Sequence, residues 1–479
     1  MPNLTPTDDK YPVIIGLVFV FNLIVGTGAL TLPSAFARAG WAWGLSVIIV
    51  LAFMSYVTTT YVVESMAAAN AIRKLQKQNE MTENDSSGEV EEERSLLVGQ
   101  ERESDSYPLA LDTLFCIEEK VELGEMATMF FNKWGRMLFY LCITIYLYGD
   151  LAIYAAAVSK SLTDVACTLT IVNGTVNTSV PDTAPCWDEN GYSRMTMYRL
   201  FLATFVAIVG PFAFFNVQKT KYLQLFTSLM RWCAFCLMIG IAIHKLCTAG
   251  PLGQPPAASV FGVPALFGAC VYSFMCHHSL PGLLQPIEDK SRLFGALAAD
   301  YLLVTAFYLL LAFTGVFAFA YLEDLYTLVF WRPGQFVGYF LALFPVFTLS
   351  TNFPVVSVTL RSNLEALSPD CNSPLVQRVV FSLLAILPPT AIAMTTTDLS
   401  ILVGVTGTYA GAGVQYVIPA LLVGAARKHS HTTLGMSSSE SKFASPFKGS
   451  LWLAFILVWS ITCVILVTIN LIEKLTMKV

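Results

Sequence analysis

The residues best suited to chemistry interrupt two long apolar stretches of the chain. Residues 22–30 read Asn-Leu-Ile-Val-Gly-Thr-Gly-Ala-Leu, and residues 274–282 read Phe-Met-Cys-His-His-Ser-Leu-Pro-Gly. A helix in hydrocarbon must satisfy its own backbone hydrogen bonds, because lipid offers no partner. A break at that depth survives where it lines a cavity that supplies other partners. Both stretches therefore predict a discontinuous helix with a binding site at its break.

The composition places most of this chain in a membrane. It has 479 residues, of which 55% are hydrophobic and 13% charged, whereas a soluble domain has about 25% charged residues. Runs of roughly 20 apolar residues mark transmembrane helices. We predict an all-α membrane protein with eleven of them, near 12–37, 41–69, 135–158, 197–216, 222–246, 261–287, 296–320, 336–360, 378–395, 399–425 and 450–472.

The two interruptions fall in helices 1 and 6, the first helix of each of two successive sets of five. Five crossings per set require the second set to be inverted in the membrane relative to the first. Paired breaks in inverted repeats are typical of secondary transporters with a central binding site. The sequence thus predicts an inverted five-plus-five repeat with one helix appended.

The first break has groups for both an anion and a cation. Gly26 and Gly28 bracket Thr27, and glycine tolerates backbone angles that a helix forbids. The N–H groups that open the second half-helix, together with its dipole, suit a carboxylate. Freed carbonyls near Val25, with the Asn22 amide, suit a hard cation such as Na⁺. The alternative is a glycine-rich helix that packs closely on a neighbour, which explains Asn22 less well.

Ionisable groups inside the membrane are candidates for proton coupling. His277 and His278 titrate near physiological pH, so either could relay a proton, or both could satisfy carbonyls of the broken helix. Asp150 could couple an ion or form a structural pair. We expect three further charged side chains to lie near span ends and to reach toward water: Glu64, Arg231 and Asp300.

An intramembrane enzyme is the least supported reading of the two histidines. On a helix, adjacent side chains diverge by roughly 100°, and the spans contain no second cluster of acids or histidines. We therefore expect no enzyme activity. Hydroxyls in 348–354 could complete a cation site, or could bond to their own helix.

Lys and Arg gather in the loops after the even-numbered spans, so the amino terminus is predicted to be cytoplasmic and the carboxyl terminus lumenal or extracellular. The loop 161–196 then lies on the far side. It contains the glycosylation patterns at Asn173 and Asn177. It also contains Cys167 and Cys186, whose bridge would close a loop worth roughly 3 kcal/mol.

A strongly acidic segment separates spans 2 and 3. Residues 80–125 hold fifteen acidic and three basic side chains, a net of −12, which leaves +7 for the rest of a chain of net charge −5. Its polar composition predicts disorder over 71–115, followed by an interfacial amphipathic helix over 117–131.

We expect membrane lipid, and no nucleic acid, as a partner. The predicted regions are 1–70 with helices 1 and 2, 71–133 as this cytoplasmic loop, 134–472 as the transporter core, and 473–479 as the tail.

Within the acidic segment, residues 92–97 read Glu-Glu-Arg-Ser-Leu-Leu. Glu92 with Leu96 and Leu97 resembles the acidic dileucine signal that adaptor proteins read on endosomal and lysosomal membrane proteins. This predicts a lysosomal or endosomal membrane rather than the plasma membrane. The alternative is a chance leucine pair in a low-complexity loop.

Four motifs resemble the amino acid/auxin permease family, which includes the sodium-coupled neutral amino acid transporters: residues 22–33, 148–150, 222–229 and 274–277. The resemblance implies the LeuT-like inverted bundle and transport of amino acids with Na⁺ or H⁺. It puts Asn22 at a cation-ligand position and Thr351 close to the hydroxyl ligand of helix 8, with Ser350 and Asn352 left open. Two departures from the family, Thr27 for serine and His278 for proline, leave the substrate and the coupling ion open.

The predicted function is a cation-coupled carrier of small amino acids that works by alternating access. The alternative is an amino-acid-sensing receptor with a transporter fold, which the long acidic loop suggests. For the substrate we predict Gly26, Thr27, Gly28, Cys276 and His277, and for the cation Asn22, Val25 and Thr351.

Overall fold

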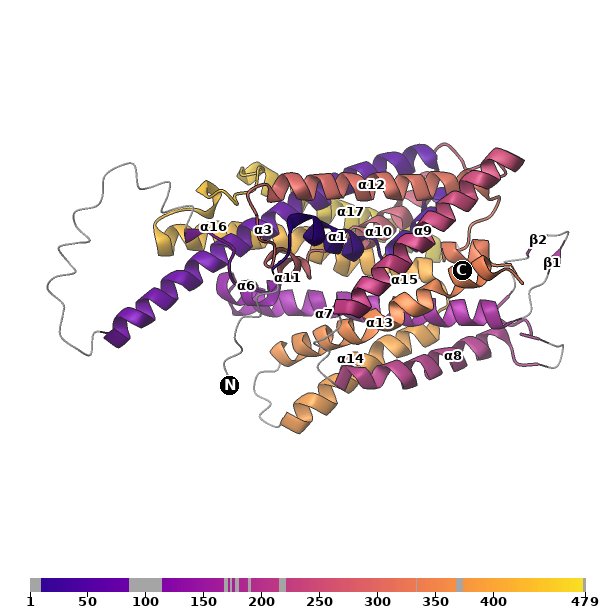
Figure 1. Cartoon of the computed structure of the whole chain (residues 1–479), viewed down its shortest axis with the longest axis horizontal. Coiled ribbons are helices and arrows are strands. Elements are labelled where there is room, and N and C mark those ends of the chain that lie inside the picture. The colour runs from indigo at the N-terminus through magenta and orange to yellow at the C-terminus, as the bar shows by residue number, and fades with distance from the viewer. Residues whose placement is uncertain are drawn as a thin grey trace.

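The computed structural model describes residues 10–85, 114–167, 171–172, 175–176, 181–187, 191–214, 221–332, 334–367 and 374–476. Long helices run side by side along the long axis of the molecule (Figure 1). The free end of α3 projects from one end of this bundle, and the strands β1 and β2 lie at the opposite end (Figure 1). We call these the α3 end and the disulfide end.

The chain forms these elements in order. The long helices and their half-helices are α1 (Val13–Ile24), α2 (Thr27–Ala39), α3 (Trp41–Asp85), α7 (Lys133–Ala166), α8 (Arg194–Val209), α9 (Lys221–Ala249), α10 (Val263–Ser273), α11 (Leu280–Leu284), α12 (Leu293–Ala318), α13 (Phe336–Leu367), α14 (Pro374–Thr395), α15 (Leu399–Thr406), α16 (Ile418–Leu434) and α17 (Ser450–Thr476). The shorter elements are α6 (Leu123–Phe130), β1 (Ile171–Val172), β2 (Thr175–Val176), and the 3₁₀ and π turns η1 (Gly210–Phe214), η2 (Val260–Gly262), η3 (Tyr326–Phe330), η4 (Gly407–Gly411), η5 (Gly413–Val417) and η6 (Ser438–Glu440).

The prediction of a helical, multi-pass membrane protein is confirmed. Eight described helices are long and apolar enough to cross a membrane, and α1 with α2 would make a ninth span, bent by 53°. Two further apolar helices, Val260–Ser273 and Val379–Thr395, are shorter than a full crossing. All eleven predicted stretches contain helix; the count of eleven spans and the inverted repeat stay predictions.

The two interrupted helices pack against each other, so that each half of one lies beside one half of the other. α2 packs along α10, and α1 packs against α11. The residues before α1 are also tied to the end of α11, because the Tyr11 N–H donates to the Pro286 carbonyl and the Glu288 N–H donates to the Tyr11 carbonyl, both at 3.1 Å. Burial raises the pKa of the Tyr11 phenol to about 12, so the phenol stays protonated and donates to the Leu283 carbonyl at 2.5 Å.

The region between spans 2 and 3 is more helical at its edges than predicted. α3 continues to Asp85, about four turns into the stretch expected to be disordered. The predicted interfacial helix is shorter than expected, because α6 covers Leu123–Phe130, and it packs against α3, α7 and α16. The sorting residues Glu92, Leu96 and Leu97 lie outside the described residues.

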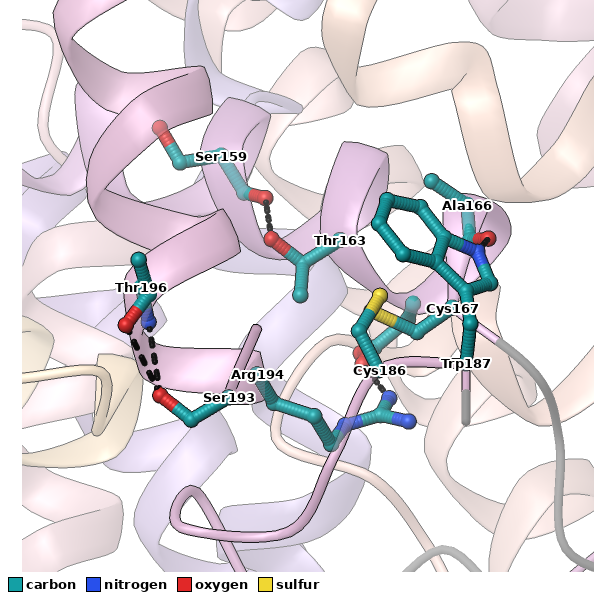
Figure 2. The surroundings of a disulfide bond; sticks show 10 residues. Ser159, Thr163, Ala166, Cys167, Cys186, Trp187, Ser193, Arg194 and Thr196 are labelled. Atoms are coloured by element: carbon teal, nitrogen blue, oxygen red, sulfur yellow. Dashed lines mark hydrogen bonds and ion pairs between the residues drawn. A yellow bond between two sulfur atoms is a disulfide. The ribbon is translucent and has the colours of Figure 1, made fainter. Parts of the chain in front are cut away.

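At the disulfide end, Cys167 and Cys186 form the predicted bridge, with Cα atoms 4.6 Å apart. Trp187 lies beside it and donates its indole N–H to the Ala166 carbonyl at 2.9 Å (Figure 2). Arg194, which opens α8, pairs with Asp164 of α7 at 2.6 Å. The bridge and the ion pair join α7 to α8 and fix the base of this loop. The glycosylation residues Asn173 and Asn177 lie outside the described residues.

Candidate functional site

The first break replaces one turn of helix by a sharp bend between Ile24 and Thr27. The Gly26 N–H donates to the Ile24 carbonyl at 2.8 Å, instead of to the Asn22 carbonyl four residues earlier, as in a continuous helix. The guanidinium of Arg231 on α9 donates to that Asn22 carbonyl. The Thr27 hydroxyl and the Asn22 amide are buried, and neither has a hydrogen-bond partner among the described residues. The break therefore leaves polar groups unsatisfied at the start of α2.

The second break is longer. α10 ends at Ser273 and α11 begins at Leu280, with no regular helix between them. The two breaks come close together, because a Cβ on Gly28 would lie 2.6 Å from the Ser273 Cα. The Tyr308 hydroxyl of α12 lies 2.9 Å from both the Ile24 and the Ser273 carbonyl oxygens. Its single O–H is shared between the two carbonyls, so this one side chain joins the exposed backbone of both breaks.

A cavity of about 710 Å³ opens between the two breaks. It continues to residues 120–125 at the α3 end and to Ser362 and Asn363 near the end of α13. Its walls come from five interrupted or neighbouring helices: Asn22, Gly26, Thr27 and Gly28; Tyr146, Asp150 and Tyr154; Thr227, Ser228 and Arg231; Tyr272, Met275 and His278; and Thr348, Leu349 and Asn352.

The predicted substrate residues divide into two groups. Gly26, Thr27 and Gly28 line the cavity. Cys276 and His277 are fully buried and are not part of the cavity lining formed by the described residues. Position along the chain could not distinguish the two groups, because an irregular segment turns successive side chains in directions that no fixed period predicts.

The side chains of Cys276 and His277 point instead into a polar cluster between α3 and α12. The His277 Nε2 lies 2.9 Å from the Thr58 hydroxyl and 3.3 Å from the Thr59 hydroxyl. The Cys276 Sγ lies 3.2 Å from the Tyr301 hydroxyl, which is itself 2.8 Å from the Thr59 hydroxyl. These contacts anchor the second break to the surrounding helices.

Two of the three candidate proton-coupling residues face the cavity. Asp150 lies on α7, lines the cavity and accepts a hydrogen bond from the Tyr272 hydroxyl of α10. The His278 ring also lines the cavity, with its centroid 5.5 Å from that of Tyr146. His277, the third, lies in the cluster beside α3.

Comparison with known proteins fits this geometry. The transmembrane amino acid transporter protein family matches residues 10–80 and 117–472. The chain belongs to this family. The match leaves out residues 81–116, which make up most of the acidic segment.

Relatives match almost the whole chain. The chain is similar to the transmembrane protein 104 homolog of Drosophila melanogaster, with 49% identity over 98% of this chain and 100% of the relative. It is similar to human transmembrane protein 104, with 47% identity over 98% of each chain. The Dictyostelium discoideum homolog is 35% identical over 94% of this chain and 95% of its own length.

The three cation ligands expected from the family do not converge in this member. Val25 is buried and does not belong to the described cavity lining, and neither does Thr351. The Thr351 hydroxyl donates to the Thr348 carbonyl of its own helix at 2.8 Å. Asn22 does line the cavity; its side-chain amide has no partner among the described residues, while its backbone carbonyl accepts from Arg231. Within this part of helix 8, Thr348 and Asn352 face the cavity instead.

The expectation that Glu64, Arg231 and Asp300 reach toward water is wrong, because all three are buried. Glu64 forms a two-pronged ion pair with Arg427, at 2.7 and 2.8 Å. Arg231 and Tyr308, which sequence reasoning missed, both hold the broken backbone. A signal existed for both: each lies near the middle of a predicted span, where a polar group needs a partner.

The disulfide end of the bundle is closed by charged contacts. Arg38 at the end of α2 pairs with Asp324, and the Ser34 hydroxyl donates to Asp324 at 3.2 Å. Lys160 of α7 lies 4.0 Å from Glu323. None of these residues is in the described lining of the cavity, which reaches only the α3 end.

Proposed function

We propose that this member of the family is a secondary active transporter of small amino acids, coupled to a cation gradient and working by alternating access. The observation that carries the proposal is the cavity between the two breaks, which continues to the α3 end. The ion pairs Arg38–Asp324 and Lys160–Glu323 lie toward the disulfide end, outside the described lining of the cavity. A binding site that reaches one face at a time is what a carrier requires.

The binding chemistry follows from the first break. α2 begins at Thr27, so its first N–H groups and its dipole are available to a substrate carboxylate. The cavity's volume of about 710 Å³ suits a small-molecule substrate. Asp150 and His278 are the groups beside the breaks that could exchange a proton as transport proceeds, and H⁺ or Na⁺ would be the driving ion. Opening the disulfide end would require the contacts of Asp324 and Glu323 to separate.

Uptake by purified protein in proteoliposomes tests the proposal. We expect saturable uptake of at least one of the proteinogenic amino acids, each labelled and tested in turn, and we expect its rate to rise with an imposed ion gradient. Empty vesicles give the background. Saturable binding without flux would reject the carrier and support the receptor; neither binding nor flux would reject both.

A matched pair of variants ties any flux to the cavity. Gly26 lines the cavity, and the nearest atom to a Cβ placed there is 3.9 Å away, so the side chain of Gly26→Leu fits only by filling the cavity. Uptake should be abolished. Gly295 on α12 has nothing within 4 Å of its Cβ position, so Gly295→Leu should keep wild-type uptake. Normal uptake by Gly26→Leu would contradict the site.

The lysosomal or endosomal location is a proposal that rests on the dileucine pattern at Leu96 and Leu97. Replacing both leucines by alanine should move the protein toward the plasma membrane, because adaptor proteins would no longer read the signal. Fluorescence microscopy against a lysosomal marker measures the shift. An unchanged vesicular location would discard the signal.

A further inference from the structure

Arg231 occupies the place where a coupling metal ion was expected. It lies within α9, its exposed fraction is 8%, and its guanidinium donates to the Asn22 carbonyl. That carbonyl lost its helical partner when the Gly26 N–H turned to Ile24. In ion-coupled carriers of this architecture, such freed carbonyls coordinate the cation. Here a protein cation already holds one of them.

The surroundings of Arg231 argue against Na⁺ beside it. A metal ion on the Asn22 side-chain amide oxygen, which has no partner among the described residues, would lie close to the guanidinium that holds the backbone carbonyl of the same residue. Two positive charges so close together repel strongly in a low-dielectric site. The other expected ligands do not help, because the Thr351 hydroxyl is committed to Thr348 and Val25 lies outside the described lining. The donor set therefore does not fit Na⁺.

Among the described residues, the charge of Arg231 has no carboxylate counter-ion. Its hydrogen-bond partner is the Asn22 backbone carbonyl, which is neutral. A buried charge without a partner is costly. Arg231 lines the same cavity as the start of α2, where the Thr27 hydroxyl also has no partner. Both the guanidinium of Arg231 and the start of α2 are therefore suited to bind an anion in this cavity.

Asp150 is an acidic side chain in the same cavity as Arg231. It lines the cavity from α7, where it accepts a hydrogen bond from the Tyr272 hydroxyl and forms no ion pair with Arg231 among the described residues. A small molecule that carries both a carboxylate and an ammonium group would satisfy both charges at once. An amine without a carboxylate would leave Arg231 unpaired.

We propose that Arg231 replaces a coupling Na⁺: its guanidinium holds the end of α1 and binds the carboxylate of the transported amino acid, so binding requires no Na⁺. The inference rests on the proposed function and names the chemistry of its site. Arg231 is part of the protein, whereas Na⁺ would bind and leave, so the positive charge of Arg231 is present in every step of the transport cycle.

The first test compares Na⁺ with choline on the wild-type protein. Equilibrium binding and uptake of the amino acid found in the screen should be equal in the two media at constant pH. Radioactive sodium should show no saturable binding to the purified protein in a scintillation proximity assay. Saturable sodium binding, or loss of amino acid binding in choline, would overturn the inference.

The second test changes the charge. Arg231→Met should weaken amino acid binding on the order of 100-fold, because one partner of a buried charge pair is lost, while Arg231→Lys keeps the charge and should lose less. The matched control is Arg199→Met, at an exposed arginine of α8. The decarboxylated amine of the same amino acid should not compete for the wild-type site.

Melting temperature separates this role from a structural one. Without ligand, Arg231→Met should melt close to wild type, because the loss of the hydrogen bond to the Asn22 carbonyl is offset by the removal of an uncompensated buried charge. A lower melting temperature with unchanged binding per folded molecule would make Arg231 purely structural and overturn the inference. Binding that depends on Arg231 but yields no flux would reject the carrier while supporting the inference, so the two failures are distinguishable.

Discussion

The two breaks look alike in sequence and differ in how their polar groups are satisfied. At the first, the Asn22 amide and the Thr27 hydroxyl face the cavity without a partner among the described residues. At the second, the Cys276 Sγ and the His277 Nε2 are held by hydroxyls of α3 and α12. A ligand can gain hydrogen bonds only where the protein has left them unmade. The first break therefore offers the groups of Asn22 and Thr27 to a ligand. In the second break, Cys276 and His277 hold the bundle together, while His278 lines the cavity and its Nδ1 also lacks a partner among the described residues.

The two breaks are nevertheless one unit. Gly28 lies against Ser273, and Tyr308 bonds the backbone of both. Moving either half-helix must disturb the other. In the alternating access that we propose, a substrate bound at the first break would act on the anchored second break through this contact.

The largest effect should come from the contact between the breaks. A Cβ on Gly28 would lie 2.5 Å from the Ser273 Oγ and 2.6 Å from the Ser273 Cα, so Gly28→Ala forces the half-helices apart at a cost of about 1–3 kcal/mol. Uptake in proteoliposomes should be lost and the melting temperature should fall. Gly26→Ala, whose Cβ has space, should keep uptake and melting temperature near those of wild type. Equal uptake and equal melting temperatures for the two variants would contradict the close contact between the breaks.

A smaller loss is expected where the breaks share a hydroxyl. Tyr308→Phe leaves the Ile24 and Ser273 carbonyls without their donor, which costs about 1–3 kcal/mol for a buried group. The melting temperature should fall, and uptake should fall with it. Tyr321→Phe, at a tyrosine that is 58% exposed, is the control and should change neither. An unaffected Tyr308→Phe would show that the hydroxyl does not couple the breaks.

Substitutions of the two adjacent histidines should affect different properties, stability at His277 and uptake at His278. His277→Gln weakens the bond to Thr58, so it should lower stability by about 1 kcal/mol with near-normal uptake per folded molecule. His278→Gln changes a cavity wall, so it should alter uptake and its pH dependence at unchanged melting temperature. The reverse pattern, measured by uptake across pH and by thermal unfolding, would exchange the roles assigned to the two side chains.

The fold was predictable because long apolar runs identify membrane helices. The breaks were predictable because polar residues in the hydrocarbon region need hydrogen-bond partners. Disulfide partners were predictable because Cys167 and Cys186 share one polar loop. The directions in which the side chains of the second break point were not predictable, because residues 274–279 follow no helical period. Arg231 was misjudged because its partner, the Asn22 carbonyl, is backbone and leaves no mark in the sequence.

The most direct test of the central claim is a density map of the purified protein with the amino acid that the uptake screen identifies. The account predicts density for the ligand in the cavity, with its carboxylate between the N–H groups of Thr27 and Gly28 and the guanidinium of Arg231. A ligand bound elsewhere, or α1–α2 and α10–α11 seen as continuous helices with no cavity between them, would contradict it.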